Sequence, residues 1–292
     1  MHLAARNLER IVMPQAVIST EAHDSYDPFY FSPLFAIEDK HFWFRSRNND
    51  IVTLVKPVIA KLNADYKILE IGCGTGNVLK ELEKVCKPGS LFGMDLFSEG
   101  LAFARQRVSC PLVQGDLHRP PFAANFDVIG LFDVIEHLPD DIQVLQDLRA
   151  MLKPAGALLL TVPAHPSLWS YFDTASRHFR RYTLKELEAK LIESGYEVEY
   201  LSQYMAILFP AVWLGRRLSG LLSRLRKHPD PAKQTRKLME TELRIIPGLN
   251  KLLFLALSWE KFLLKRHLRL PIGTSLIVVA RTRKLVNWTP EN

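Results

Sequence analysis

The sequence has few cysteines and lacks both a long apolar run and an internal repeat. Its three cysteines, Cys73, Cys86 and Cys110, have neither disulfide-framework nor metal-ligand spacing, which favours a reducing compartment. No stretch of about 18 apolar residues occurs, so a simple transmembrane helix is not expected. Residues 1–13 carry charges and no apolar core, so no signal peptide is expected either.

What remains is an ordinary globular composition with an uneven charge. Of the 292 residues, 48% are hydrophobic and 24% charged, enough for one large domain or a domain with an insertion. The net charge is +7, but residues 205–271 alone hold 14 Lys or Arg against 4 Asp or Glu. The rest of the chain is therefore slightly acidic, and the basic character belongs to one segment.

From residue 66 onward, short apolar runs alternate with amphipathic stretches. Strands are expected at 67–71, 90–94, 111–114, 126–132, 157–162, 197–201 and 274–280. Helices are expected at 77–85, from about Ser98, which would be the N-cap, and at 141–152, where residues 153–156 end the helix. A further helix is expected at 183–194, because Thr183 and Glu186 stand in capping-box positions and Gly195 follows its end. This alternation predicts an α/β fold, a mostly parallel sheet with helices on both faces.

Three regions are expected. Residues 1–62 form an aromatic-rich N-terminal extension, residues 63–204 and 272–285 form the core, and residues 205–271 form a basic helical insertion before the last strand.

The most informative segment is Ile68–Gly76, reading ILEIGCGTG, where an apolar strand enters a glycine-rich turn. Glycines permit positive φ and close approach to a ligand. Dinucleotide-binding proteins use G-x-G-x-x-G to hold a pyrophosphate at a helix N-terminus. Here the spacing is G-x-G-x-G, and Glu70 precedes it by two residues. An acid there repels phosphate but can hold an ammonium group, which suits the aminoacyl end of S-adenosylmethionine.

Two more acids end the next strands. Asp95 follows Glu70 by 25 residues, where a carboxylate can accept both ribose hydroxyls of an adenosine. Asp116 follows the third strand and can accept from the adenine amine. The alternative for the glycines alone is a tight structural turn. Three ligand-facing edges at the carboxyl ends of one sheet favour the nucleoside site.

With these positions, residues 66–204 and 272–283 resemble the class I S-adenosylmethionine-dependent methyltransferase family. The resemblance implies a Rossmann-like seven-stranded sheet whose last strand is antiparallel, with the cofactor over the carboxyl ends of the first, second and fourth strands. The cofactor-binding candidates are Glu70, Gly72, Cys73, Gly74, Gly76, Asp95, Leu96, Asp116, Leu117 and Phe132. Residues 126–138, FDVIGLFDVIEHL, are similar to small-molecule members, including quinone O-methyltransferases.

Two histidines are candidate catalytic bases. His137 follows the fourth strand, a region beside the methyl group in the family, and a neutral imidazole can take a proton. The alternative is that Glu136 and His137 only shape the loop. This pair is also similar to part of a metal site in RNA methyltransferases, but only two of the ligands are present, so no metal is expected. His178 is the second candidate.

Residues 164–183 follow the fifth strand and are rich in His, Arg, Tyr and Trp. The run resembles one in bacterial class I methyltransferases encoded near glycan, lipid or polyketide pathways, and it can bind an anionic or hydroxylated acceptor. Alternatively, its Arg and Asp pair with each other. In the extension, residues 41–47 form a lid over the cofactor or pack on the core. The substrate-binding candidates are Trp43, His165, Trp169, Arg180, Arg181 and Tyr182.

The basic insertion contains two apolar helical patterns. In the first, one face holds leucines and the other arginines and lysines (Leu214, Leu218, Leu221, Leu222, Leu225; Arg216, Arg217, Arg224, Lys227), with Trp213 near its start. The second, at 251–264, contains Trp259 and Phe262. Such patterns fit an interfacial helix on anionic lipid. A lid or a dimer interface is the alternative.

The sequence therefore predicts methyl transfer to a hydroxyl of a small or lipid-linked acceptor, with carbon or nitrogen as alternative acceptor atoms. The protein is expected in the cytoplasm, in peripheral contact with the inner face of the membrane through residues 205–271. A nucleic-acid substrate is disfavoured, since residues 132–135 lack the Asn/Asp-Pro-Pro-aromatic signature used on nucleobase amines. The alternatives are an RNA methyltransferase that uses the basic insertion, and a non-catalytic cofactor-binding partner.

Overall fold

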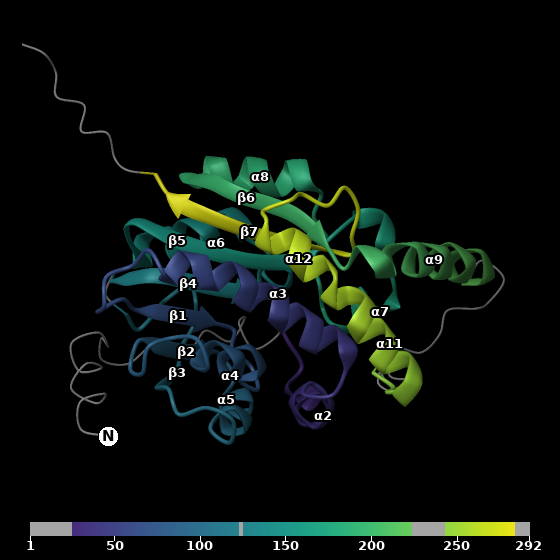
Figure 1. Cartoon of the computed structure of the whole chain (residues 1–292), viewed down its shortest axis with the longest axis horizontal. Helices are drawn as coiled ribbons and strands as arrows, with labels where there is room; N and C mark the ends of the chain where they lie inside the picture. The colour runs from purple at the N-terminus through teal and green to yellow at the C-terminus, as the bar shows by residue number, and fades with distance from the viewer. Residues whose placement is uncertain (1–24, 123–124, 224–242, 284–292) are drawn as a thin grey trace, which may run out of the picture.

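The computed structural model describes residues 25–122, 125–223 and 243–283, which form a seven-stranded sheet (Figure 1). The strand order is β3-β2-β1-β4-β5-β7-β6. The strands are β1 (Ile68–Ile71), β2 (Leu91–Asp95), β3 (Leu112–Gln114), β4 (Phe126–Phe132), β5 (Leu152–Pro163), β6 (Tyr196–Tyr204) and β7 (Ser275–Thr282). Strands β1 to β5 pair in parallel, whereas β7 is antiparallel to β5 and β6. This confirms the predicted α/β fold and its antiparallel last strand.

Helices connect and cover these strands. The α-helices are α2 (Phe31–Ile37), α3 (Phe42–Ile59), α4 (Asn77–Glu83), α5 (Ser98–Ala104), α6 (Asp141–Met151), α7 (Tyr171–Ala175), α8 (Leu184–Glu193), α9 (Phe209–Ser223), α11 (Pro247–Ser258) and α12 (Glu260–Lys265). Short 3-10 turns are η2 (Pro28–Tyr30), η3 (Ile135–His137), η4 (Pro166–Leu168) and η5 (Ala206–Leu208).

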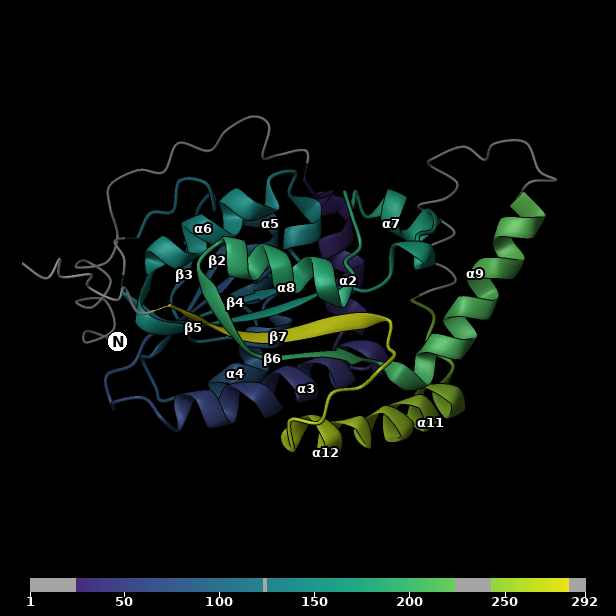
Figure 2. The ribbon, with the colours of Figure 1, turned by 90° about the horizontal axis from the view of Figure 1, so that it is seen from above.

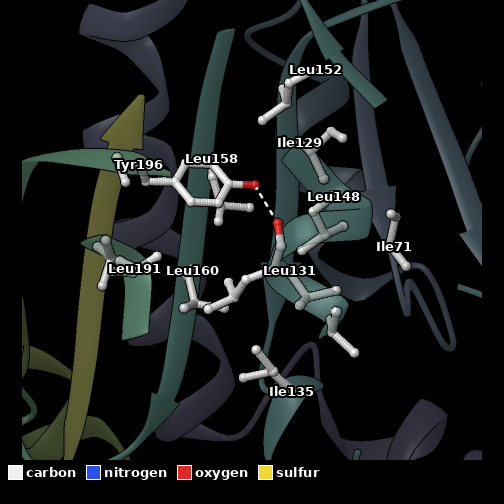
Figure 3. Close-up of a cluster of buried hydrophobic side chains, with 14 of the residues drawn as sticks. Ile71, Ile129, Leu131, Ile135, Leu148, Leu152, Leu158, Leu160, Leu191 and Tyr196 are labelled. Atoms are coloured by element: carbon white, nitrogen blue, oxygen red, sulfur yellow. Dashed lines mark hydrogen bonds between the residues drawn. The ribbon is translucent and has the colours of Figure 1, made fainter. Parts of the chain in front are cut away.

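The sheet is the middle layer of three. Helices α6 and α8 pack on one face, while α3 and α4 pack on the other, with α11 and α12 lying outside against α3 (Figure 2). Strands β1 and β4 are buried along nearly their whole length, because both faces of a parallel sheet are covered. On the α6–α8 side, the Tyr196 hydroxyl donates to the carbonyl of Leu145 at 2.9 Å within the apolar core (Figure 3). The buried hydroxyl of Tyr196 is thereby satisfied.

Three local predictions need correction. Ser98 is the first residue of α5 rather than its N-cap: Phe97 stands at the N-cap position without a side-chain capping bond, and its N–H donates to Asp95 at 2.9 Å. Residues 153–156 belong to β5, which starts directly after α6 and carries an irregularity opposite the start of β4. The apolar pattern at 251–264 forms two helices that break at Trp259.

Other local predictions are confirmed. Thr183 caps α8, since its side chain accepts from the N–H of Glu186 at 3.2 Å. Gly195 follows that helix with φ +86°, as a helix C-terminus favours.

The described part of the N-terminal extension, residues 25–62, is helical and is fixed to the core by a buried ion pair. Arg107, which follows α5, pairs with Glu38 at the end of α2 and also donates to the Thr75 hydroxyl, at 2.5 and 2.6 Å. Thr75 lies inside the glycine loop. The extension is therefore tied to the segment that the sequence assigns to the cofactor.

The insertion leaves the sheet after β6. Helix α9 projects from the body of the molecule, whereas α11 and α12 return along α3 (Figure 2). The predicted face of α9 can be followed only to Leu218, because the side chains of residues 219–223 and everything from 224 to 242 lie outside the described residues. Within the described parts of the chain, no helix has the length and apolarity needed to span a bilayer.

Candidate active site

The glycine loop leaves β1 through three residues in the left-handed region. Gly72, Gly74 and Gly76 have φ values of +70°, +50° and +76°. A Cβ at Gly72 would lie 2.4 Å from Cγ2 of Val134, which follows β4. Only glycine fits this turn without strain and collision, so the loop can pass close under the carboxyl end of β4.

Asp95 holds this loop from the neighbouring strand. Its carboxylate accepts from the N–H of Gly74 at 2.6 Å and from the N–H of Phe97 at 2.9 Å. Burial raises the pKa of Asp95 to about 6, although these backbone hydrogen bonds oppose the shift. The carboxylate is thus fixed at the carboxyl end of β2, where the sequence places a ribose.

Glu70 is buried with one oxygen unpartnered. Its Oε2 has no hydrogen-bond partner among the described residues. Burial raises the pKa of Glu70 well above its ordinary value, the nearby Arg47 lowers it and Asp95 raises it. A buried, unpartnered carboxyl oxygen is costly unless a ligand supplies a donor. An ammonium group supplies one, so the residues present fit the aminoacyl end of S-adenosylmethionine.

Arg47 brings a buried positive charge to the same edge. It comes from α3 and pairs with Asp133, directly after β4, at 2.8 Å. Asp133 has φ +56°, so its backbone bends sharply where the strand ends. The guanidinium also lies 5.1 Å from the centre of the Trp43 ring. The predicted lid residue Arg47 therefore reaches the cofactor edge, and half-buried Trp43 packs behind it.

The remaining cofactor candidates surround this edge. Asp116 is buried and accepts from the N–H of His118 at 2.9 Å. Cys73, Leu117 and Phe132 are buried as well. Leu96 is half-buried. Their contacts with a cofactor stay a prediction.

A buried polar cluster lies after β4 and β5. Asp173 is fully buried and accepts from His178 Nδ1 at 3.1 Å and from Arg181 Nε at 2.6 Å. Burial alone would raise the pKa of Asp173, but the hydrogen bond of His178 and the charge and hydrogen bond of Arg181 outweigh it and lower the pKa to about 2. The His178 ring meets that of His137 edge-on, with centroids 4.6 Å apart. The structure thus brings both candidate bases together.

Local backbone structure explains this meeting. Ser170 and Asp173 form a capping box that starts α7, and the chain then turns back so that the N–H of Phe179 donates to the carbonyl of Glu136 at 2.7 Å. This bond joins the loop after β5 to η3 after β4. Burial and the neighbouring His178 lower the pKa of His137 to about 3, so His137 stays neutral at pH 7.

Glu136 completes the cluster. Ligand atoms of Glu136, His137 and His178 all lie within 4.8 Å of one another. Burial and the charge of Asp133 raise the pKa of Glu136 well above its ordinary value, which favours its neutral form. The expectation of no metal stays a prediction, which removal of metal ions would test.

Three of the substrate-binding candidates have charged or hydroxyl groups that pair with acidic side chains. Arg181 is buried against Asp173, and the Tyr182 hydroxyl is buried against Asp141 at 3.0 Å. Arg180 also pairs with Asp141, at 2.6 Å. Only the Arg181–Asp173 pair joins charges within residues 164–183, whereas Arg180 and Tyr182 pair with Asp141 of α6. Each of these three side chains therefore has a structural partner, and their contact with an acceptor is untested.

His165 and Trp169 lie nearer to the surface. His165 Nε2 is 2.6 Å from Oε1 of Gln203, and its ring contacts that of Phe209 at the start of α9. Trp169 is exposed. His165 thus has a structural partner as well, and the contact of either residue with an acceptor stays a prediction.

Sequence reasoning missed two aromatic residues that cover the site. Tyr26 contacts the rings of Phe97 and His137, with centroids 6.3 and 5.6 Å away. Phe31 lies 3.6 Å from where a Cβ on Gly74 would stand. Residues 25–31 therefore lie over both the cofactor loop and the histidine cluster. Their distance from the site in sequence hides this role.

A glycine loop, two acids on successive strand ends and this sheet order together define a class I S-adenosylmethionine-dependent methyltransferase. Residues 43–201 match the family described as the methyltransferase domain. Since the match covers more than half of the chain, this protein belongs to that family, and S-adenosylmethionine is its cofactor.

Curated relatives are more distant. A demethylmenaquinone methyltransferase of Shouchella clausii is 27% identical over 51% of this chain and 66% of its own length. A ubiquinone biosynthesis O-methyltransferase of Hydrogenovibrio crunogenus is 25% identical over 43% of this chain and 49% of its own length. The chain thus spans between about half and two thirds of the curated relatives it matches.

Solved structures agree on the fold. Phosphoethanolamine N-methyltransferase 2 of Haemonchus contortus, in complex with S-adenosylmethionine, has a TM-score of 0.56 at 17% identity, covering 93% of this chain and 61% of that one. An S-adenosylmethionine-dependent methyltransferase of Thermotoga maritima has a TM-score of 0.51 at 14% identity, covering 88% and 100%.

Proposed function

We propose that this protein transfers a methyl group from S-adenosylmethionine to a hydroxyl of a small or lipid-linked acceptor, in peripheral contact with a membrane through residues 205–271. The observation that carries the hydroxyl assignment is the buried Asp173–His178 pair beside His137. A hydroxyl must lose its proton on methylation, whereas a neutral amine can attack without a base. A positioned histidine therefore favours an oxygen acceptor.

In this proposal His178 is the base. Asp173 accepts from Nδ1, which leaves Nε2 to take the proton of the acceptor hydroxyl. His137 is the weaker candidate, since its lowered pKa makes protonation of its buried ring unfavourable. The His137 ring instead packs edge-on against the His178 ring and holds it in place. When bound, S-adenosylmethionine supplies a methyl group on a sulfonium, from which a neutral thioether would leave without needing an acid.

The other groups bind and orient. Glu70 accepts from the cofactor ammonium, Asp95 accepts from the ribose, and Arg47 places a positive charge beside them for the cofactor carboxylate. Tyr26 and Phe31 exclude water from the edge. Relatives named for ubiquinone biosynthesis and demethylmenaquinone suggest a hydroxylated ring as the acceptor class to test first.

The test is transfer of labelled methyl groups to hydroxylated aromatic acceptors, with and without a long hydrocarbon tail. His178→Ala should lower the turnover by about 100-fold or more, the usual contribution of a general base, and change its pH dependence. Cofactor affinity should stay unchanged. His137→Ala is the matched variant and should have the smaller effect on turnover. If His178→Ala keeps the wild-type rate and pH profile, His178 is not the base.

A further inference from the structure

We propose that the outer face of α11 and α12 binds the surface of an anionic lipid bilayer. This outer face consists of Leu249, Leu252, Leu255, Trp259 and Phe262. The inference deepens the proposed function, because it narrows the membrane contact proposed for residues 205–271 to these two helices and to an anionic surface.

The outer face is apolar although it faces solvent. Leu252 and Trp259 are 62% and 74% exposed, and the other three side chains are close to half exposed. The five recur every third or fourth residue, so they form one stripe along the two helices. A surface helix ordinarily carries polar residues on that side. A contiguous exposed apolar stripe marks a docking surface.

The inner side of the same helices is already filled. Leu257 and Leu264 are buried in the core under α3, and the Phe254 ring lies 3.8 Å from the guanidinium carbon of Arg45. Packing on α3 therefore accounts for one apolar side and leaves the other without a structural purpose. The outer face can be changed without disturbing the core.

Charge selects the partner. In the described residues 205–223 and 243–271, eight Lys or Arg stand against one acid, Glu260. Glu260 is buried, and its carboxylate accepts from the N–H groups of Ala206 and Ile207 at 3.1 and 2.9 Å. Among these described residues, the exposed charges are therefore all positive. Anionic headgroups complement them, whereas a second copy would bring like charges together.

The outer face adjoins the candidate active edge. At the start of α11, Asn250 accepts from the N–H of Phe42 at 2.8 Å and donates to the carbonyl of Lys40 at 3.0 Å, which fixes it to the start of α3. Helix α9 begins beside His165 and carries exposed Trp213, Leu214 and Leu218. Figure 1 shows α9 and α11 toward the same end of the molecule as α7. A bilayer on this face lies next to the site.

The test is flotation of the full chain with vesicles of phosphatidylglycerol and phosphatidylcholine, and with phosphatidylcholine alone. The wild type should bind the anionic vesicles at least ten-fold more tightly. A Leu252→Glu/Trp259→Glu variant should lose at least ten-fold of that binding. Ile192→Glu is the matched control, because Ile192 is 44% exposed on α8, and it should bind like the wild type.

S-adenosylmethionine affinity by calorimetry and sedimentation velocity complete the design. Unchanged cofactor affinity in the double variant shows that it is folded. If the wild type ignores anionic vesicles, the bilayer proposal is overturned whether or not methyl transfer is found. If the wild type is a dimer that the double variant dissociates, with no vesicle binding, the outer face is a subunit interface. Vesicle binding without methyl transfer would instead overturn only the proposed methyl transfer and leave the membrane contact standing.

Discussion

The carboxyl edge of the sheet and the α11–α12 helices depart from the usual distribution of residues in opposite directions. At the edge, the carboxyl group of Glu70 is buried, and one of its oxygens has no hydrogen-bond partner among the described residues. On the outer face of α11 and α12, large apolar groups such as Leu252 and Trp259 are exposed. Each departure costs stability on its own, so each indicates a partner that the isolated chain lacks. We therefore propose that the two regions serve different ligands, a charged nucleoside at the edge and a lipid surface at the outer face.

The largest expected effect comes from removing one buried charge at the edge. Asp173→Ala leaves Arg181 buried without its carboxylate, which should lower the free energy of unfolding by roughly 3–5 kcal/mol. Chemical denaturation measures it. Glu199→Ala is the matched control, because Glu199 pairs with Arg281 at a similar distance but is partly exposed, so it should cost about 0–1 kcal/mol. Equal losses in the two variants would mean that burial does not determine how much an ion pair contributes to the free energy of unfolding.

Acid should weaken the same cluster. The pKa of Asp173 is about 2 in the fold and near 3.8 in the unfolded chain, so its carboxylate stabilises the fold above about pH 4. That contribution, about 2 kcal/mol, is lost as the pH falls from 4 toward 2. Denaturation midpoints of wild type and Asp173→Asn should converge over this range. If the two midpoints keep a constant difference over this pH range, the lowered pKa of Asp173 is contradicted.

The next effect separates the two regions by ligand. Asp95→Ala removes the proposed acceptor of the ribose hydroxyls and the anchor of the Gly74 N–H, and should weaken cofactor binding by roughly 1–3 kcal/mol. Calorimetry with S-adenosylhomocysteine measures it. Vesicle binding should not change. A variant that loses vesicle binding together with cofactor binding would show that the regions are coupled.

The same contrast explains what the sequence could reveal. The position of Glu70, the glycines and Asp95 at one edge of the sheet was predictable, because each stands next to the end of a strand and parallel strands align those ends. The Arg47–Asp133 pair joins positions 86 residues apart, and nothing in their spacing indicates it. The sequence offered pairing within 164–183 as an alternative. It could not show that Asp173 is buried and shared by His178 and Arg181, because burial is set by the whole fold.

The structure of the insertion was harder to predict from the sequence, for a different reason. Its apolar periodicity predicts helices, and helices are present, but periodicity alone cannot tell which apolar side lies on protein. Leu257 and Trp259 are two residues apart, equally apolar, and differ from buried to mostly exposed. Only the position of α3 decides between them.

The smallest expected effect isolates the charges of the insertion from its apolar stripe. Lys261 and Lys265 are exposed on α12, and each lysine near an anionic surface contributes about 1 kcal/mol, or roughly five-fold in affinity. Lys261→Gln and Lys265→Gln should each weaken binding to phosphatidylglycerol vesicles by about that factor, and the loss should shrink in high salt, where the charges are screened. Lys185→Gln is the control, because Lys185 is also exposed but belongs to α8 rather than to the insertion. If the losses persist in high salt, the lysines act through packing, and the selection of an anionic partner rests on the stripe alone.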